Sequence, residues 1–223
     1  MKALGQCLTL LELGDPDMLS AVKSAKGPMA RVTAFTGAPG AGKSSLIAAL
    51  LPHLKGKVGV LASDPSSRRT GGALLGDRTR VSTQPENVFY RSMATRGASG
   101  SLAAATEPAL ALLALCGYET ILLETVGSGQ QEASAHGMAH TLVLVLSPEA
   151  GDHVQLMKAG VLEDAGVIVV TRGSKPEAVA LSTLLDDMLS VRRNPKPKVL
   201  VVDSLSGQGV GDVALTLQDG TRT

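Results

Sequence analysis

The chain has 223 residues, of which 44% are hydrophobic and 18% are charged. It is therefore long and apolar enough to bury a core, which excludes a disordered chain. The formal net charge of +1 excludes general electrostatic attraction to nucleic acid or to an acidic membrane. Trp is absent and Tyr and Phe number two each, so no aromatic platform for stacked bases is expected.

The cysteines and the apolar segments exclude further classes of protein. The two cysteines, Cys7 and Cys116, have neither metal-ligand spacing nor a disulfide pattern. Glu12 and Asp15 interrupt the first apolar run, unlike a signal peptide. No apolar stretch reaches the roughly 18 residues that cross a bilayer. We therefore expect a soluble, cytoplasmic protein without a membrane or nucleic-acid partner.

The chain begins with a helical lead-in over residues 1–27, ended by "KGP", and residues 28–223 then read as one domain. Short apolar runs predict strands at 31–37, 57–64, 119–125, 140–147, 165–172 and 197–204. Most of these runs are apolar almost throughout, as in strands covered on both faces, so the sheet should be mostly parallel.

Helix-like segments separate the strands. They start at Lys43 and cover 106–116, about 152–163 and 176–193. Pro52 should end or kink the first helix, because proline lacks the N–H and clashes with the preceding turn. The stretch 64–106 is irregular, with one plausible strand at 87–92. The alternation of strands and helices predicts a doubly wound α/β fold.

The first strand and helix flank a glycine-rich loop, "GAPGAGKS" at 37–44, which fits G-x-x-x-x-G-K-[ST]. Glycines let backbone N–H groups approach phosphate oxygens and form an anion nest. The helix N-terminus adds partial positive charge. This context predicts P-loop NTPase architecture, with residues 28–223 as the nucleotide-binding domain.

Each residue of the loop has an expected part in binding a nucleoside triphosphate. Lys43 should reach the β and γ phosphates, and the Ser44 hydroxyl should ligate Mg²⁺. The remaining predicted nucleotide contacts are Gly37, Ala38, Pro39, Gly40, Ala41, Gly42 and Ser45.

Two acidic residues end predicted strands. Asp64 closes the run at 57–64, and Glu124 closes the run at 119–125. In α/β sheets the carboxyl ends of the strands face the ligand, so both carboxylates should lie near the phosphate loop. There they can hold the metal or its waters, and the glycines at 127 and 129 allow a loop to move.

The order of motifs resembles the MeaB-like (ArgK-like) P-loop GTPases, the family of the methylmalonic aciduria type A protein. The resemblance rests on "GAPGAGKSS" (37–45), "DPSSRRTGGALLGDRTR" (64–80), "ETVGSGQQE" (124–132) and "GDHVQLMKAG" (151–160), with "LTLLELGD" (8–15) as a similar lead-in.

This resemblance implies a GTP-hydrolysing switch and chaperone of an adenosylcobalamin-dependent acyl-CoA mutase such as methylmalonyl-CoA mutase. By position, Asp64, Asp77 and Glu124 would surround the metal and water. Residues 151–160 would be a switch loop whose Lys158 approaches the nucleotide when the partner binds. The resemblance also implies a homodimer, which family members usually make through a helical arm after their last loop. This sequence ends soon after that loop, so the homodimer is kept as an open prediction and the route to it is in question.

The base-reading motif departs from the family. Where N-K-x-D is expected, the chain has Thr171, Arg172, Gly173 and Ser174. Ser174 lacks the charged acceptors that meet guanine's two donors, although Arg172 could stack on a base. Ser204 and Leu205 begin the similar last base-contacting loop. We therefore expect GTP and ATP to bind within about tenfold of each other, roughly 1.4 kcal/mol.

Three alternatives remain open at this point. The first is a weakly catalytic or non-catalytic nucleotide-binding paralogue, favoured by the altered base motif. The second is a metal-insertion GTPase, because Glu132, His136 and His140 have the i, i+4, i+8 spacing of one helix face. The third is a small-molecule kinase, for which no acceptor site is evident in the sequence.

Overall fold

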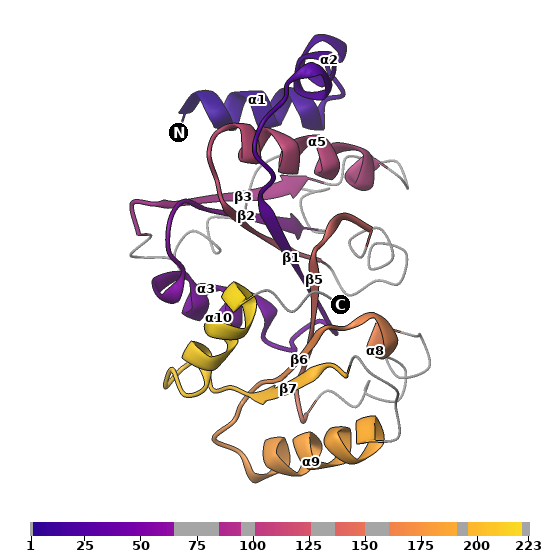
Figure 1. The fold of residues 1–223 in the computed structure, drawn as a ribbon, viewed down its shortest axis with the longest axis vertical. Coiled ribbons are helices and arrows are strands. Elements are labelled where there is room, and N and C mark those ends of the chain that lie inside the picture. The colour runs from indigo at the N-terminus through magenta and orange to yellow at the C-terminus, as the bar shows by residue number, and fades with distance from the viewer. Residues whose placement is uncertain are drawn as a thin grey trace. The chain divides into compact units, whose positions relative to one another are not determined.

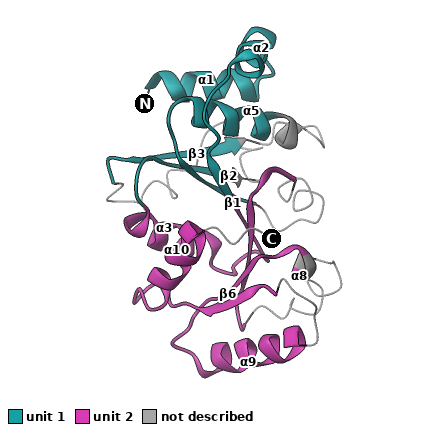
Figure 2. Ribbon diagram, in the orientation of Figure 1, with its two compact units in different colours: residues 1–32, 55–124 teal, residues 33–54, 125–223 magenta. Residues whose placement is uncertain are grey.

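The computed structural model describes residues 2–64, 85–94, 101–125, 137–149, 161–190 and 196–219. The chain divides into two compact units, shown in Figure 2. Unit 1 consists of Met1–Val32 and Lys55–Glu124, and unit 2 of Thr33–Leu54 and Thr125–Thr223. The predicted boundary at residue 27, between lead-in and nucleotide-binding domain, stays a prediction.

The described residues include seven strands (Figure 1), and every strand pair with a defined register is parallel. They are β1 (Arg31–Thr36), β2 (Val58–Asp64), β3 (Val88–Ala94), β4 (Thr120–Glu124), β5 (Thr141–Leu146), β6 (Val167–Val170) and β7 (Lys198–Val201). Unit 1 contributes the order β3-β2-β4, and unit 2 the order β1-β5-β6-β7. The predicted α/β class with a parallel sheet is confirmed.

In unit 1, three helices accompany the strands: α1 (Lys2–Glu12), α2 (Pro16–Ser24) and α5 (Ser101–Leu115). The sequence suggests one short N-terminal helix, but Gly14 takes a φ of +74° and Asp15 caps α2 by accepting a hydrogen bond from the Met18 N–H. This turn divides the segment into two helices. Both α1 and α2 pack against α5, and Leu8 and Leu11 of α1 are fully buried.

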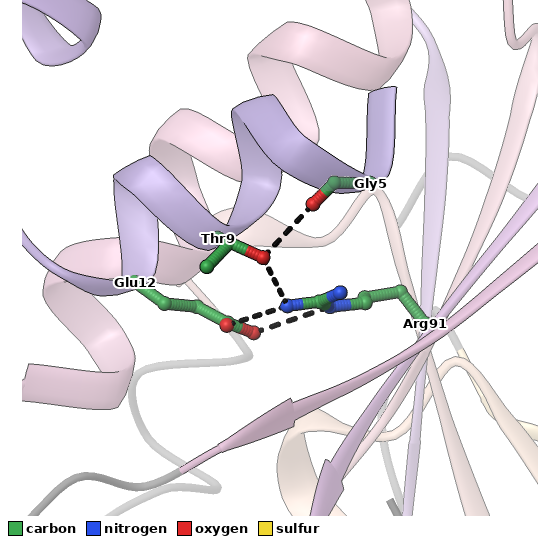
Figure 3. A network of polar contacts seen from close by, with 4 residues as sticks. All are labelled: Gly5, Thr9, Glu12 and Arg91. Carbon is green, nitrogen blue, oxygen red and sulfur yellow. Dashed lines mark hydrogen bonds and ion pairs between the residues drawn. The ribbon is translucent and has the colours of Figure 1, made fainter. Parts of the chain in front are cut away.

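A polar network joins α1 to β3 (Figure 3). Arg91 of β3 donates a hydrogen bond to Glu12 Oε2 at 2.7 Å and to Thr9 Oγ1 at 3.0 Å, and Thr9 in turn donates to the Gly5 carbonyl. The Glu12 side chain is only 4% exposed. A buried carboxylate is tolerable here because it is both paired and hydrogen-bonded. The network makes α1 an integral part of unit 1.

In unit 2, β5 and β6 are buried along their whole length. Leu144 and Ile168 belong to a core that also includes Leu181 and Leu185 of α9 (Pro176–Ser190). Side chains alternate across a strand, so Val143 and Val145 point to the opposite face, where they are equally buried. Burial on both faces explains why these strands read as continuous apolar runs.

The remaining helices differ from the prediction in instructive ways. As expected from Pro52, α3 (Lys43–Leu50) ends just before it, and a single 3₁₀ turn, η1 (Leu51–His53), follows. Most of the expected helix at 152–163 lies outside the described residues. The described residues at its end belong to the helix α8 (Val161–Asp164). Helix α5 begins earlier than predicted, at Ser101.

One helix was not predicted at all, namely α10 (Val210–Asp219). It packs against α3 in unit 2. Its buried residues Val210, Val213, Ala214 and Leu217 have the i, i+3, i+4, i+7 spacing of an amphipathic helix. This periodicity is a sequence signal that could have identified the helix.

Candidate nucleotide-binding site

The glycine-rich loop connects β1 to α3 within unit 2 and has the backbone that its sequence predicts. Gly37, Gly40 and Gly42 take φ values of +141°, +79° and +97°. A Cβ on Gly37 would overlap the carbonyl oxygen of Val145, so no other residue fits there. Gly42 is the N-cap of α3 and offers no side-chain cap. The partial positive charge at this N-terminus of α3 can attract an anion.

Lys43 opens α3 and turns back along the loop. Its Nζ donates to the carbonyl oxygens of Gly37 at 2.6 Å and Ala38 at 3.0 Å, and the residue is only 8% exposed. Backbone carbonyls thereby satisfy an ammonium group that would otherwise be costly to bury. The loop therefore holds its cation at the mouth of the predicted phosphate nest. Ser44 and Ser45 follow on the first turn of α3, and both are exposed.

Thr171 joins the phosphate loop to the segment predicted to read the base. Its buried hydroxyl donates to the Ala41 carbonyl at 2.8 Å, and its N–H donates to the Leu146 carbonyl at 2.8 Å. The Thr171 methyl group would lie 3.3 Å from a Cβ on Gly42. Thr171 therefore acts through the loop backbone in this structure, and its predicted contact with nucleotide stays a prediction.

The next residue, Arg172, is the one non-glycine residue with positive φ in the described part of the chain, at +59°. Such a conformation is strained for a residue with a Cβ. Arg172 forms an ion pair with Glu149, which also pairs with Lys175. The guanidinium is therefore directed to the segment after β5, and the stacking of Arg172 on a base remains a prediction.

Ser174 faces a carboxylate that the sequence analysis did not single out, Asp203. The Ser174 N–H donates to Asp203 Oδ2 at 3.3 Å, while Asp203 Oδ1 accepts from the N–H groups of Leu205 and Ser206, each at 3.0 Å. The Ser174 side chain is the main cause that lowers the pKa of Asp203 to about 2, and the backbone hydrogen bond from Ser206 lowers it further.

The segment 204–209 continues from Asp203 as a tight turn. The Asp203 N–H donates to the Gln208 carbonyl, and a Cβ on Gly209 (φ +74°) would overlap the Val201 carbonyl oxygen. Leu205 projects outward and is 98% exposed. Ser204 and Leu205 therefore lie in a rigid loop beside Ser174. Their predicted contacts with a base are untested, but a polar residue directly after an apolar run, as in "VVDS", was the signal that could have pointed to Asp203.

The predicted metal residues are described only in part. In unit 1, Glu124 ends β4 and is half-buried, and its register partner Ala62 precedes Asp64 by two residues on β2. The two acidic positions thus share one edge of the unit 1 strands, and their place near the phosphate loop stays a prediction. Asp77 and Lys158 lie outside the described residues.

The histidine spacing receives no support from the described residues. Glu132 and His136 fall outside them, and His140 is exposed directly before β5. No cluster of three or more His, Cys, Asp or Glu residues that could hold a metal occurs in the ranges that the structure describes. Likewise, none of the helices in those ranges is long and apolar enough to cross a membrane.

Comparison with a family model identifies the chain. Residues 4–222 match the model of the methylmalonyl-CoA mutase-associated GTPase MeaB. The chain belongs to the MeaB family. The resemblance inferred from the motifs is thereby confirmed, as is the prediction of a P-loop GTPase at the level of the family.

Individual relatives agree with this membership. The MeaB-family chain is 38% identical to a putative GTPase of Pyrococcus horikoshii, over 95% of this chain and 71% of the relative. It is 36% identical to a probable GTPase of Mycobacterium tuberculosis, over 97% and 70%. It is 34% identical to the mitochondrial methylmalonic aciduria type A homolog of Mus musculus, over 86% of this chain and 49% of that protein.

Solved structures confirm the architecture. The crystal structure of an LAO/AO transport system kinase matches with a TM-score of 0.76 and 25% identity, over 97% of this chain and 69% of that chain. A HypB from Helicobacter pylori in complex with nickel matches with a TM-score of 0.63 and 17% identity, over 95% and 94%. At that identity the second similarity shows the fold alone.

Proposed function

We propose that this MeaB-family chain is a Mg²⁺-dependent GTP-type nucleoside triphosphatase that acts as a switch and chaperone for an adenosylcobalamin-dependent acyl-CoA mutase. The proposed hydrolase activity is supported by the geometry of the loop between β1 and α3. Its positive-φ glycines, the N-terminus of α3 directly after them and the inward-held Lys43 fit a chain of phosphates. The mutase part is supported by the family match over residues 4–222.

In this proposal Lys43 exchanges its bonds to the Gly37 and Ala38 carbonyls for β and γ phosphate oxygens. It then stabilises the negative charge that develops as the β,γ bond breaks. Backbone N–H groups of the loop and of the first turn of α3 would orient the phosphates by hydrogen bonds. A bound Mg²⁺ would supply further charge neutralisation across the phosphates.

The metal site would consist of few protein ligands. Mg²⁺ commonly keeps several waters and takes one or two side chains besides substrate phosphates. The Ser44 hydroxyl, exposed on the first turn of α3, would be a direct ligand. We assign Asp64, Asp77 and Glu124 to the metal and its waters, and Lys158 to a residue that partner binding brings to the nucleotide.

The experiment is phosphate release with GTP, with ATP and without nucleotide, each with and without Mg²⁺. We expect Mg²⁺-dependent release that Glu124→Gln lowers more than it lowers nucleotide affinity. Glu119→Gln is the matched control, because Glu119 directly precedes β4 at the opposite end from Glu124. It should leave the rate of phosphate release unchanged. Equal rates for Glu124→Gln and the parent would remove Glu124 from the site.

The partner is tested separately. Adding purified methylmalonyl-CoA mutase should change the rate of phosphate release, and adding an unrelated acyl-CoA enzyme should not. If the mutase does not change the rate of phosphate release, the proposed role as a switch for the mutase would be contradicted, but the proposed hydrolase activity would not. The homodimer and the cytoplasmic location stay predictions.

A second candidate is a nucleotide-binding paralogue that hydrolyses little and discriminates poorly between bases. It is favoured by one observation, the Ser174 that stands where the family's carboxylate is expected. Tight binding of GTP and ATP without measurable phosphate release in the presence of Mg²⁺ and the mutase would favour this candidate over the first.

A further inference from the structure

A buried hydroxyl directly after β5 stands out in unit 2. Ser147 is 1% exposed, and in the ranges that the structure describes its Oγ is the one buried side-chain N or O atom without a hydrogen-bond partner. Buried hydroxyls are normally paired, because removal from water without a partner costs free energy. An alanine at this position would avoid that cost, so the Ser147 hydroxyl calls for a functional explanation.

The strand order places Ser147 beside the start of the phosphate loop. Strand β5 pairs with β1, and Gly37 is the first residue after β1. Its backbone lies so close to β5 that a Cβ on Gly37 would overlap the carbonyl oxygen of Val145. Ser147 follows two residues after Val145, where β5 ends and the loop begins.

The pairing of β5 with β6 indicates which face Ser147 occupies. The register ends at Leu146 and Val170, so Ser147 and Thr171 are the next residues of the two strands. Leu146 and Val170 belong to the core beneath α9, and successive side chains of a strand point to opposite faces. Thr171 accordingly reaches the Ala41 carbonyl of the phosphate loop. By the same alternation, Ser147 lies on the phosphate-loop face of the strands.

The phosphate loop has acceptors that suit this donor. Lys43 Nζ donates to the carbonyl oxygens of Gly37 and Ala38, and both of these loop residues are buried. An ammonium group has three N–H donors. If two of them turn to β and γ phosphate oxygens, at most one remains for two carbonyls. At least one buried carbonyl then needs a new donor.

We propose that Ser147 is a positioning residue of the phosphate loop, whose hydroxyl donates to the Gly37 or Ala38 carbonyl that Lys43 releases when Lys43 turns to the phosphates. The inference rests on the proposed function, since it requires a triphosphate in this loop. The hydroxyl is unpaired while Lys43 bonds the carbonyls and is paired once Lys43 bonds phosphate. Ser147 therefore favours the loaded arrangement, and it does so without touching the base.

Removing the hydroxyl should have opposite effects on stability and on binding. Without nucleotide, Ser147→Ala removes an unpaired buried group, so the melting temperature should rise by about 2–4 °C. With nucleotide, the released carbonyl is left without a donor, so the affinity for GTP and for ATP should fall alike, by about tenfold. Ser147→Cys keeps a weak S–H donor and should bind with intermediate affinity.

The matched control removes a buried hydroxyl that is already paired. Thr216 of α10 donates to the Asp212 carbonyl and accepts from Lys198 Nζ. Thr216→Val should therefore lower the melting temperature and leave both nucleotide affinities unchanged.

The measurements are thermal unfolding without nucleotide, followed by circular dichroism, and displacement of a ribose-labelled fluorescent GTP by unlabelled GTP and ATP in the presence of Mg²⁺. A higher melting temperature together with weaker binding of both nucleotides would support the proposal. A melting temperature that falls in Ser147→Ala would show that the hydroxyl is already paired, for instance by a buried water, and would overturn it. So would affinities equal to those of the parent, or a loss for one nucleotide only.

Failure of the proposed function gives a different result. In that case the parent itself would bind neither the labelled GTP nor ATP. A parent that binds both, with a Ser147→Ala variant that binds them equally well, would overturn only the role of Ser147.

Discussion

The two ends of the candidate site in unit 2 are built in opposite ways. The phosphate end is one contiguous segment, residues 37–45, whose glycines, lysine and serines sit together in the sequence. The base end is assembled from residues 171–174 and 203–209, which are joined by hydrogen bonds of Asp203 and Gly173. The phosphate end can therefore be recognised from the sequence alone, whereas the base end depends on how two distant segments pack.

The largest effect should come from the phosphate end. We expect Lys43→Ala to weaken GTP and ATP binding alike, by at least about a hundredfold, roughly 3 kcal/mol, because it removes the cation that the loop carbonyls hold. Nucleotide titration by fluorescence measures this. Lys175→Ala, which removes an exposed lysine paired with Glu149, is the control. An unchanged affinity in Lys43→Ala would refute the phosphate-loop interpretation and with it the contrast between the two ends.

Next in size is the backbone of the loop. Gly37→Ala should destabilise the protein by roughly 2–3 kcal/mol, since its φ is +141° and the new Cβ would overlap the Val145 carbonyl. Gly40→Ala is the matched comparison, because its φ of +79° is also positive but its Cβ would meet nothing within 4 Å. It should cost only about 1 kcal/mol.

Urea unfolding followed by circular dichroism gives both free energies. If Gly40→Ala proves as destabilising as Gly37→Ala, backbone conformation alone would account for the loss, and the close approach of β1 and β5 would not matter.

Changes at the base end should have a smaller effect, on the ratio of GTP affinity to ATP affinity, and this effect should depend on Ser174 and Asp203 together. Ser174→Asp alone would place a second carboxylate against Asp203, and like charges so close disfavour each other. We therefore expect little gain in guanine preference from the single change. Ser174→Asp combined with Asp203→Ser should raise the GTP-to-ATP affinity ratio to about a hundredfold, because charge-assisted hydrogen bonds contribute roughly 1.5–3 kcal/mol.

Competitive displacement measures this ratio, with Asp203→Ser alone as the control. A single Ser174→Asp variant that is as selective as the double variant would show that the two carboxylates do not oppose each other.

The smallest effect concerns pH. Hydrogen bonds from the Ser174 side chain, and then from the N–H groups of Ser206 and Leu205, lower the pKa of Asp203 to about 2, against about 3.9 for an unfolded chain. The unfolded state therefore binds the proton more readily, so the stabilisation by Asp203 is complete above about pH 4 and is lost as the pH falls through about 2.

The measurement is urea unfolding of the parent and of Asp203→Asn from pH 7 to pH 3. The difference in unfolding free energy should stay constant down to about pH 5 and shrink below pH 4. A difference that grows on acidification would contradict the assignment of Asp203 as an ionised acceptor.

Much of the fold was predictable because its signals are local. The apolar runs located the strands to within a few residues, and Pro52 marked the end of α3 at Leu50. Helix α10 was not predicted, although the regular spacing of its buried residues is a local signal as well. The division of the N-terminal segment into α1 and α2 depended on a turn at Gly14 and Asp15, which is equally local and could have been predicted.

By itself, the sequence determined the parallel α/β class, the phosphate loop and the family, because each depends on neighbouring residues or on a regular spacing along the chain. Only the tertiary structure decided what the base end contains. Residues 174 and 203 are far apart in the chain, and neither local sequence predicts a contact with the other. Parallel strands β6 and β7 bring their carboxyl ends together, and that packing alone places Asp203 against Ser174, where its carboxylate accepts a hydrogen bond from the Ser174 N–H.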